Sequence, residues 1–208
     1  MSLVFFDMDK SLVRGVSSLI LANLLGKHKE GRRLERLVKT GRITDEEFTL
    51  RMGGLANGAT IYQLRAIYAT MPFIGGIQET VEALKTMGMK TAIVTQGVGE
   101  FAGMMCRDFG FDFSYGSSTE WNDKGELRNF GPPFVTAEDK ASYALELCGQ
   151  LKFDPDDCYA VGDSPADIPI FHAVGNGIAI NYRDELAGHA THCIRPCPDL
   201  TQILPLID

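Results

Sequence analysis

Short apolar runs alternate with longer segments of helical periodicity along most of the chain. The first run is Leu3–Phe6, and similar runs follow at residues 90–95, 158–161, 177–180 and 192–194. Segments with apolar residues at helical spacing lie between or after them, at residues 77–87, 100–109, 137–148 and 199–207. Strands that alternate with helices build a parallel sheet that is covered on both faces. The pattern therefore predicts an α/β fold with a doubly wound, Rossmann-like parallel sheet.

One long segment departs from this alternation. Helical patterns follow one another, with no strand between them, at residues 16–25, 30–38, 44–55 and 60–69. Thr44 followed three residues later by Glu47 resembles a capping box, and Met71-Pro72 ends the last helix. We therefore expect a small all-helical cap at residues 15–72, inserted after the first strand. Residues 1–14 and 73–208 would form the core.

A different signal appears between residues 111 and 133. Residues 111–115 fit a short strand, and the turn residues Asn122-Asp123-Lys124-Gly125 predict a β-hairpin over residues 117–129. Gly131-Pro132-Pro133 predicts a loop. All of this falls within the part of the chain assigned to the core.

Composition narrows the classes of protein that remain. The chain has 208 residues, 45% of them hydrophobic, and a net charge of −7 that argues against non-specific nucleic-acid binding. No apolar run approaches the ~20 residues of a membrane span, and no signal peptide is expected at the N-terminus. The cysteines number five and show no C-x-x-C spacing, so we expect reduced thiols and a cytoplasmic protein.

The charge is unevenly distributed. Residues 27–42 hold seven basic and two acidic residues, so this segment carries +5 and the remainder of the chain −12. The basic residues are Lys27, Lys29, Arg32, Arg33, Arg36, Lys39 and Arg42. The segment is either a solvated helix face or an electrostatic funnel for an anionic substrate.

Two aspartates follow the first strand. Side chains two positions apart on an extended segment point the same way, so Asp7 and Asp9 can face one reacting centre. Asp7 can attack as a carboxylate nucleophile, while Asp9 can donate a proton and later accept one from water. Two acids at the end of an apolar strand are costly without a cation, and oxygen ligands suit Mg²⁺.

Polar residues also end other predicted strands. Ligands of open α/β sheets bind at the carboxyl ends of strands, where Thr95 and Asp163 would join the aspartate pair. The Thr95 hydroxyl and the N–H groups of Gln96 and Gly97 can donate to a phosphoryl oxygen. Lys140 can neutralise charge on the transferring group. Asp163 can complete a metal site with Asp7.

These residues together resemble the haloacid dehalogenase superfamily of phosphohydrolases, and within it the phosphoserine-phosphatase group. Asp7-Met8-Asp9-Lys10-Ser11 is similar to the first motif, Ile93-Val94-Thr95 to the second, Lys140 to the third and 162–167 to the fourth. The resemblance implies that Asp7 is the nucleophile and Asp9 the acid and base. It also implies that Asp7, the main-chain carbonyl of Asp9 and Asp163 hold Mg²⁺, supported by Asp167. Ser11, in the first motif, is expected among the substrate-binding residues.

The chain departs from the pattern of that group at three positions. Val16 stands where a glutamate is expected to bind the substrate amine, and Ala166 where an asparagine is usual. Arg51 fits the arginine that grips the substrate carboxylate only with a shift of one residue. We therefore expect a small anionic phosphomonoester that is not phosphoserine.

The function expected from the sequence is Mg²⁺-dependent hydrolysis of such a small phosphorylated substrate through an aspartyl-phosphate. A dehalogenase needs no second acid, and a P-type ATPase needs membrane helices. Phosphoserine phosphatase proper, transfer of the phosphoryl group to an acceptor other than water, and a non-catalytic binding protein remain as alternatives. The last of these would be expected to have lost a motif residue, and none is lost.

Overall fold

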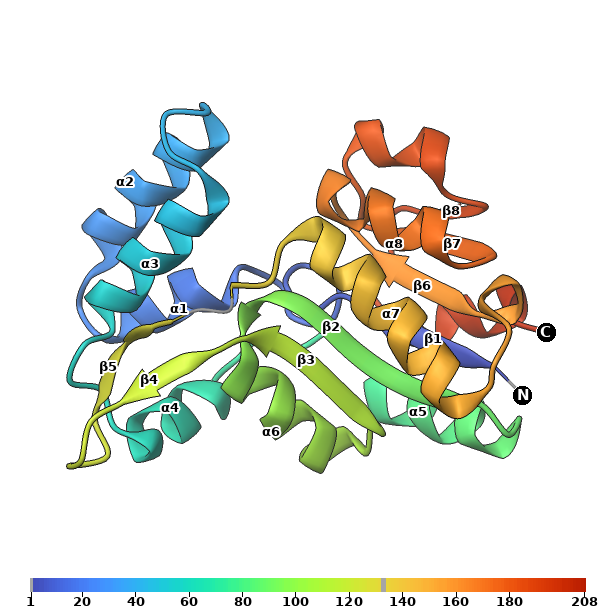
Figure 1. Ribbon diagram of the computed structural model, residues 1–208, viewed down its shortest axis with the longest axis horizontal. Coiled ribbons are helices and arrows are strands. Elements are labelled where there is room, and N and C mark those ends of the chain that lie inside the picture. Colours follow the sequence, from blue (N-terminus) through green and yellow to red (C-terminus); the bar gives the residue numbers. More distant parts are fainter. Residues whose placement is uncertain (1, 132–133) are drawn as a thin grey trace.

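The centre of the fold is a six-stranded sheet, seen here in a computed structural model that describes residues 2–131 and 134–208 (Figure 1). The order is β3-β2-β1-β6-β7-β8, and every neighbouring pair runs parallel. The strands are β1 (Leu3–Phe6), β2 (Lys90–Val98), β3 (Phe113–Ser117), β6 (Tyr159–Gly162), β7 (Asn176–Ile180) and β8 (His192–Ile194). The chain winds outward from β1 in one direction and then in the other. The predicted doubly wound sheet is therefore confirmed, with its switch point at β1.

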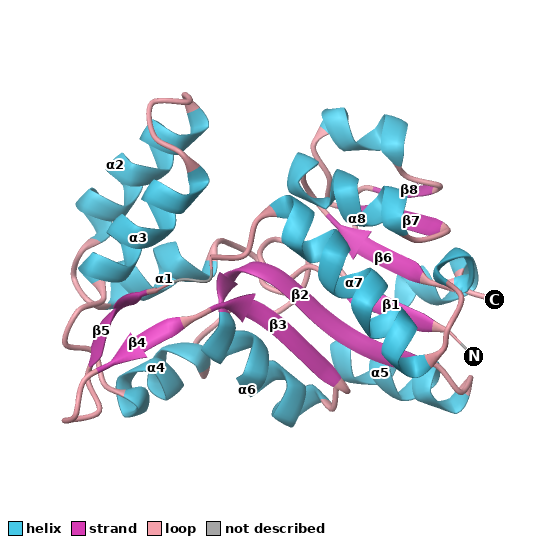
Figure 2. Ribbon diagram, in the orientation of Figure 1, coloured by secondary structure: helices cyan, strands magenta, loops and turns pink. Residues whose placement is uncertain are grey.

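Helices cover both faces of this sheet (Figure 2). Alternate residues of β1 point to opposite faces, so Phe6 packs in one core cluster and Phe5 in the other. The Phe6 side is covered by α5 (Ile77–Thr86) and α6 (Gly99–Phe109), and the Phe5 side by α7 (Ala137–Leu151) and α8 (Ile168–Ala173). Among the described residues, no helix is long and apolar enough to cross a membrane.

Local details of the core differ from the predicted elements. The closing segment, expected as a helix over 199–207, is a 3₁₀ helix over Leu200–Leu206. Pro205 lies inside it and cannot donate the backbone hydrogen bond that an α-helix requires there. Strand β2 continues to Val98, three residues beyond the predicted end. The predicted loop at 131–133 lies in part outside the described residues.

Residues 17–68 form the predicted cap helices. They are α1 (Ser17–Leu24), α2 (His28–Lys39), α3 (Asp45–Leu55) and α4 (Ile61–Tyr68). The Thr44 hydroxyl accepts a hydrogen bond from the Glu47 N–H at 3.1 Å, which begins α3 where the capping pattern placed it. The carboxylate of Glu47 pairs with Arg51, so the reciprocal half of the predicted box is replaced by an ion pair along the helix.

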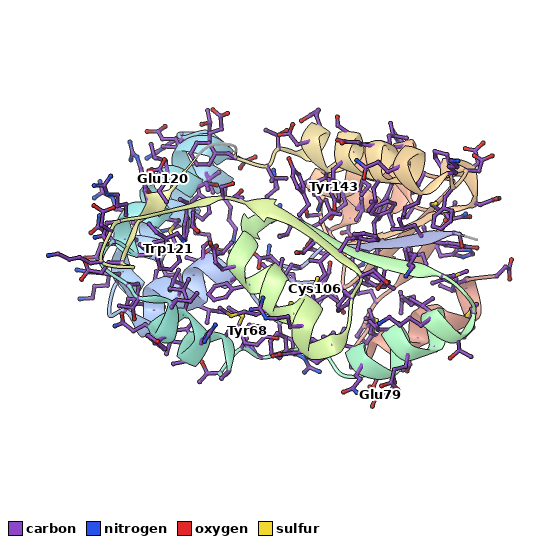
Figure 3. The ribbon with its side chains drawn as sticks, turned by 60° about the horizontal axis from the view of Figure 1, so that its bottom comes forward. Tyr68, Glu79, Cys106, Glu120, Trp121 and Tyr143 are labelled. Atoms are coloured by element: carbon purple, nitrogen blue, oxygen red, sulfur yellow. The ribbon has the colours of Figure 1, made fainter. Side chains whose placement is uncertain are left out.

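The β-hairpin of β4 (Thr119–Trp121) and β5 (Leu127–Phe130) packs against these helices. The Leu127 N–H donates to the Ala59 carbonyl, and the Gly58 N–H to the Leu127 carbonyl, both at 2.8 Å. A Cβ at Gly53 would lie 2.2 Å from the Phe130 nitrogen, so α3 approaches β5 this closely only with a glycine there. Trp121 marks the hairpin in Figure 3, beside the cap. The hairpin belongs in sequence to the predicted core but packs on the cap helices. The predicted domain bounds, residues 1–14 and 73–208 for the core and 15–72 for the cap, therefore stay a prediction.

Candidate active site

The order of the strands brings the predicted motif residues to one edge of the sheet. Asp7 follows the central strand β1, whose neighbours β2 and β6 carry Thr95 and Asp163 at the same edge. The Asp7 N–H donates to the Val161 carbonyl at 2.9 Å, which extends the sheet to the aspartate itself. A cavity of about 680 Å³ opens over this edge, and its lining includes Asp7, Asp9, Thr95, Gln96, Gly97 and Asp163.

Lys140 reaches this edge from the first turn of α7. Thr136 and Asp139 form a complete capping box that begins the helix. The Lys140 side chain is buried, and its Nζ lies 2.8 Å from Oδ1 of Asp7 and also donates to Asp167. Burial lowers the pKa of Lys140, but the charges of Asp167 and Asp7 outweigh it and raise the pKa overall. The ammonium is therefore held charged beside the predicted nucleophile.

Two carboxylates bind this ammonium, and a third, Asp163, lies close to both of them. Oxygens of Asp7, Asp163 and Asp167 lie within 4.8 Å of one another. Burial raises the pKa of Asp7 well above its usual value; Lys140 opposes this rise, and the charges of Asp167 and Asp163 add to it. Burial and the charge of Asp167 raise the pKa of Asp163 to about 7. A buried, electron-rich oxygen cluster of this kind fits a divalent cation, which would relieve the repulsion.

Asp167 is committed to holding its neighbours. Its Oδ2 accepts from the N–H groups of Asp163 and Ser164 at 3.1 Å, while its Oδ1 accepts from Lys140. A Cβ at Gly162 would lie 2.3 Å from Cγ of Asp167, so the strand end must be a glycine for this approach. With both oxygens occupied, Asp167 suits a supporting position better than direct ligation of a metal.

Asp9 faces a different neighbour. Its Oδ1 accepts from the N–H of Ser17, the first residue of α1, at 2.9 Å. Burial raises the pKa of Asp9, and the Ser17 hydrogen bond opposes that rise. Asp9 is not part of the three-carboxylate cluster found among the described residues. Ser17 was not predicted as a site residue, because a serine at the start of a helix usually signals only the helix itself.

The loop after Thr95 differs from the expected arrangement of donors. The Gly97 N–H, expected to face a phosphoryl oxygen, donates to Oγ1 of Thr95 at 2.9 Å. The register between β2 and β3 shifts between Val94 and Val98, which leaves this stretch outside the regular ladder. Because Oγ1 already accepts from Gly97, the Thr95 hydroxyl keeps its own proton for a ligand in the cavity.

The cap contributes the opposite wall of the cavity. Residues of this wall are Val16, Ser18, Val38, Asp45, Glu46, Phe48 and Thr49. None of the seven basic residues of 27–42 is among the described residues that line it. Glu35 pairs with Arg32 at 3.2 Å and Lys39 at 2.8 Å on the helix surface. The structure therefore favours the solvated helix face over the anionic funnel.

Two predicted substrate-binding residues lie away from the cavity. Arg51 pairs with Glu47 and borders a separate hollow between α2 and α3. Ser11 is buried under the first motif, and its hydroxyl has no hydrogen-bond partner among the described residues. Neither is among the described residues that line the cavity, so both assignments stay predictions without support from the geometry. Sequence reasoning also missed Arg183, whose backbone N–H donates to the Asp163 carbonyl at 2.9 Å and whose charge lowers the pKa of Asp163.

Several known proteins are similar to this chain in sequence. The sequence pattern of the haloacid dehalogenase-like hydrolases matches residues 1–175. A phosphoserine phosphatase of Archaeoglobus fulgidus is 28% identical over 184 residues, covering 88% of this chain and 54% of that protein. This chain thus spans about half the length of that relative. A phosphoserine phosphatase of Methanocaldococcus jannaschii is 25% identical over 206 residues, covering 99% of this chain and 97% of that protein.

Solved structures agree on the fold. A haloacid dehalogenase family hydrolase from Salmonella enterica superimposes with a TM-score of 0.92 at 22% identity, covering 100% of this chain and 71% of that one. A substrate-bound phosphoserine phosphatase superimposes with a TM-score of 0.88 at 23% identity, covering 100% of this chain and 98% of that one. The predicted resemblance to phosphoserine phosphatases is confirmed. From the match over residues 1–175, this chain belongs to the haloacid dehalogenase-like hydrolase family.

Proposed function

We propose that this chain is a Mg²⁺-dependent phosphatase that hydrolyses a small phosphomonoester through an aspartyl-phosphate on Asp7. The observation that carries the proposal is the position of Asp7 at the switch point of the sheet. There its carboxylate meets Lys140 at 2.8 Å and lies in one cluster with Asp163. Family membership supports a hydrolase. The names of the relatives support a phosphorylated substrate.

The first half of the reaction would form the covalent intermediate. A carboxylate oxygen of Asp7 attacks phosphorus, and the bond between phosphorus and the leaving alcohol oxygen breaks. Asp9 gives a proton to that oxygen, so the alcohol departs neutral. Lys140 and the Thr95 hydroxyl offset negative charge on the transferring phosphoryl group.

The second half would release phosphate. Asp9, now a carboxylate, takes a proton from a water molecule that attacks the phosphorus of the aspartyl-phosphate. The bond between phosphorus and Asp7 breaks, which regenerates the free carboxylate and inorganic phosphate. Asp9 thus returns to its protonated form, ready for the next ester.

Mg²⁺ would be held by Asp7, the main-chain carbonyl of Asp9 and Asp163, with Asp167 fixing the loop behind them. The three buried carboxylates around a single ammonium support this assignment. When bound, the ion would neutralise the charge of the phosphoryl group and allow the Asp7 carboxylate to approach it.

The cap wall bears on the substrate. Asp45 and Glu46 line the cavity there, beside apolar groups such as Phe48. The described cap residues on that wall include no cation, which counts against the small anionic substrate expected from the basic segment. We therefore propose that the leaving alcohol is neutral or carries an ammonium group. Phosphoserine, whose carboxylate would face the same wall, is expected to be a poorer substrate than its decarboxylated counterpart, phosphoethanolamine.

A screen of phosphomonoesters with Mg²⁺, followed by trapping of the phospho-enzyme, tests the proposed function. We expect release of inorganic phosphate and a phosphorylated peptide that contains Asp7, identified by mass spectrometry after rapid acid quench. Phosphate on any other residue, or hydrolysis without a phospho-enzyme, would contradict the mechanism. Transfer to an added alcohol in place of water would favour a phosphotransferase.

A further inference from the structure

The start of the first cap helix lacks a cap of its own. Val16 occupies the N-cap position of α1 with extended backbone angles (φ −99°, ψ 116°), and it has no side-chain oxygen to accept from the first turn. The Ser17 N–H donates to Oδ1 of Asp9 at 2.9 Å instead. A carboxylate of the core thus accepts a hydrogen bond from a cap helix that cannot cap itself.

This contact lies where α1, the first motif and β2 meet, and the Met8 side chain packs there as well. Ser17 is fully buried, and its hydroxyl has no partner among the described residues. A Cβ added at Gly97 would lie 3.0 Å from Oγ of Ser17 and 3.2 Å from Oδ2 of Asp9. The glycine of β2 therefore lets α1 and the Asp9 carboxylate come together against the sheet.

The two connections between core and cap also bind to each other. The Arg14 N–H donates to the Pro72 carbonyl at 2.7 Å, and the Ile74 N–H to the Leu12 carbonyl at 3.0 Å. These bonds tie the outgoing and the returning chain side by side. Ser17, the first residue of α1, comes three residues after Arg14, so a shift of α1 on the core would move its N–H relative to Asp9.

We propose that Ser17 is a positioning residue whose backbone N–H aims Asp9 at the leaving-group oxygen only while the first cap helix is seated on the core. The inference rests on the proposed role of Asp9 as proton donor. The N–H fixes Oδ1 as an acceptor, so the transferable proton sits on Oδ2. That oxygen passes its proton to the leaving alcohol as the bond to phosphorus breaks. Proton donation by Asp9 therefore depends on the position of the first cap helix.

Two substitutions at residue 17 separate the N–H from the hydroxyl. Ser17→Pro removes the N–H at the first helical position, where proline is tolerated, and the extended angles of Val16 suit a residue that precedes proline. Ser17→Ala keeps the N–H and removes the hydroxyl, which also faces Asp9, so it measures what the hydroxyl adds to the effect of the N–H. Circular dichroism and thermal melting establish that each variant is folded.

The readout is the dependence of kcat/KM on the leaving group. Propyl phosphate releases a poor leaving group that needs protonation, whereas p-nitrophenyl phosphate releases a phenolate that leaves without it. Ser17→Pro is expected to lower kcat/KM for propyl phosphate by about 10²-fold, the lower end of general-acid contributions. For p-nitrophenyl phosphate the loss should stay within about threefold, since Asp9 then contributes little to bond cleavage. Ser17→Ala, which keeps the N–H, should lower kcat/KM for propyl phosphate by clearly less than Ser17→Pro does.

If Ser17 served folding alone, Ser17→Pro would lower kcat/KM for both esters by the same factor, and that result would overturn the inference. So would full activity of Ser17→Pro on propyl phosphate. If the proline variant does not fold, an ester in place of the amide at residue 17, introduced by semisynthesis, removes the same N–H without the ring and is judged by the same ratio. A wild-type enzyme that hydrolyses neither ester with Mg²⁺ would reject the proposed function itself, which is a distinct outcome.

Discussion

The two walls of the active-site cavity differ in how firmly their residues are held. On the core wall, Thr95 and Asp163 are almost fully buried, and Lys140 behind them is fixed by two carboxylates. On the cap wall, Asp45 and Glu46 are exposed on the first turn of a helix. The core wall cannot change without unpairing buried charges, whereas the cap wall can change at little cost to the fold. Reaction type is thus expected to reside in the core and substrate choice in the cap.

The largest expected effect on the core wall is loss of the nucleophile. Asp7→Asn should leave no measurable turnover and no phospho-enzyme, because uncatalysed hydrolysis of phosphate monoesters is slower by up to ~10²¹-fold. Asp123→Asn, the same change at an exposed hairpin turn, is the control and should behave as wild type. Residual activity above one hundredth of wild type in the purified Asp7→Asn protein would show that another residue attacks phosphorus.

Metal removal should abolish activity as well, and it should leave a signature in stability. Chelation is expected to stop turnover, and added Mg²⁺ to restore it. Because the folded pKa of Asp163 is raised to about 7, the stability it contributes in metal-free protein is full below about pH 4 and is lost as pH rises through 7. Mg²⁺ replaces the proton, so it should raise Tm more at pH 8 than at pH 5.

The matched control for this experiment is Asp163→Asn, which is neutral at every pH. The metal-free variant should lose part of the fall in Tm between pH 5 and pH 8, because Asp7 and Asp9, whose pKa values are also raised, keep the rest. Mg²⁺ should no longer stabilise the variant strongly. If Mg²⁺ raised the Tm of the wild-type protein equally at pH 5 and pH 8, the proposed metal site would be contradicted. Differential scanning calorimetry provides both measurements.

Substitution of Lys140 is expected to have the next largest effect. Lys140→Ala should lower kcat/KM by about 10²–10³-fold, the usual cost of losing one charge-stabilising donor. It should also lower the free energy of unfolding by about 3–5 kcal/mol, because Asp7 and Asp167 lose their buried partner. Lys152→Ala, beyond the exposed end of the same helix, is the control. A kinetic loss below tenfold would mean that another cation serves the phosphoryl group.

The core wall was readable from the sequence because each of its residues ends a recognisable element. Apolar runs located β1, β2 and β6, and parallel strands bring their carboxyl ends together, so Asp7, Thr95 and Asp163 could be predicted to meet. The Thr136 capping box located the first turn of α7, and with it Lys140. Local patterns therefore determined the core wall.

The cap wall was not readable, since it depends on how helices turn about their axes. One residue along an α-helix is a rotation of about 100°, so an alignment shifted by one position changes the face on which Arg51 is expected. Asp45 and Glu46 lie in the first turn of α3, where acidic residues are common, so their position in the sequence does not point to a cavity. The packing of the hairpin on α3 is a contact between distant segments, which the pattern of either segment alone does not contain.

Substitutions in the cap wall should have the smallest effects, and these should appear as changes in the ratio of kcat/KM between substrates. For three esters of similar length, with ammonium, methyl or carboxylate ends, kcat/KM is expected to fall in that order: phosphoethanolamine, propyl phosphate, phosphoglycolate. Asp45→Asn combined with Glu46→Gln should reduce the preference for ammonium over carboxylate by about tenfold. That factor corresponds to ~1.4 kcal/mol, within the range of short charge interactions near a surface.

Glu47→Gln is the matched control for the cap wall, since it removes the same charge from the same helical turn at a position that does not line the cavity. It should leave the order and the ratios unchanged, as should Arg33→Gln on the outer face of the cap. Raising the salt concentration from 0.05 to 0.5 M should reduce the difference in kcat/KM between phosphoethanolamine and phosphoglycolate in the wild-type enzyme. The reason is that salt screens the electrostatic interaction of the cap carboxylates with the substrate. Phosphoglycolate as the best of the three esters would show that the cap wall does not select by charge. The basic helix α2 would then have to act on the substrate from outside the cavity.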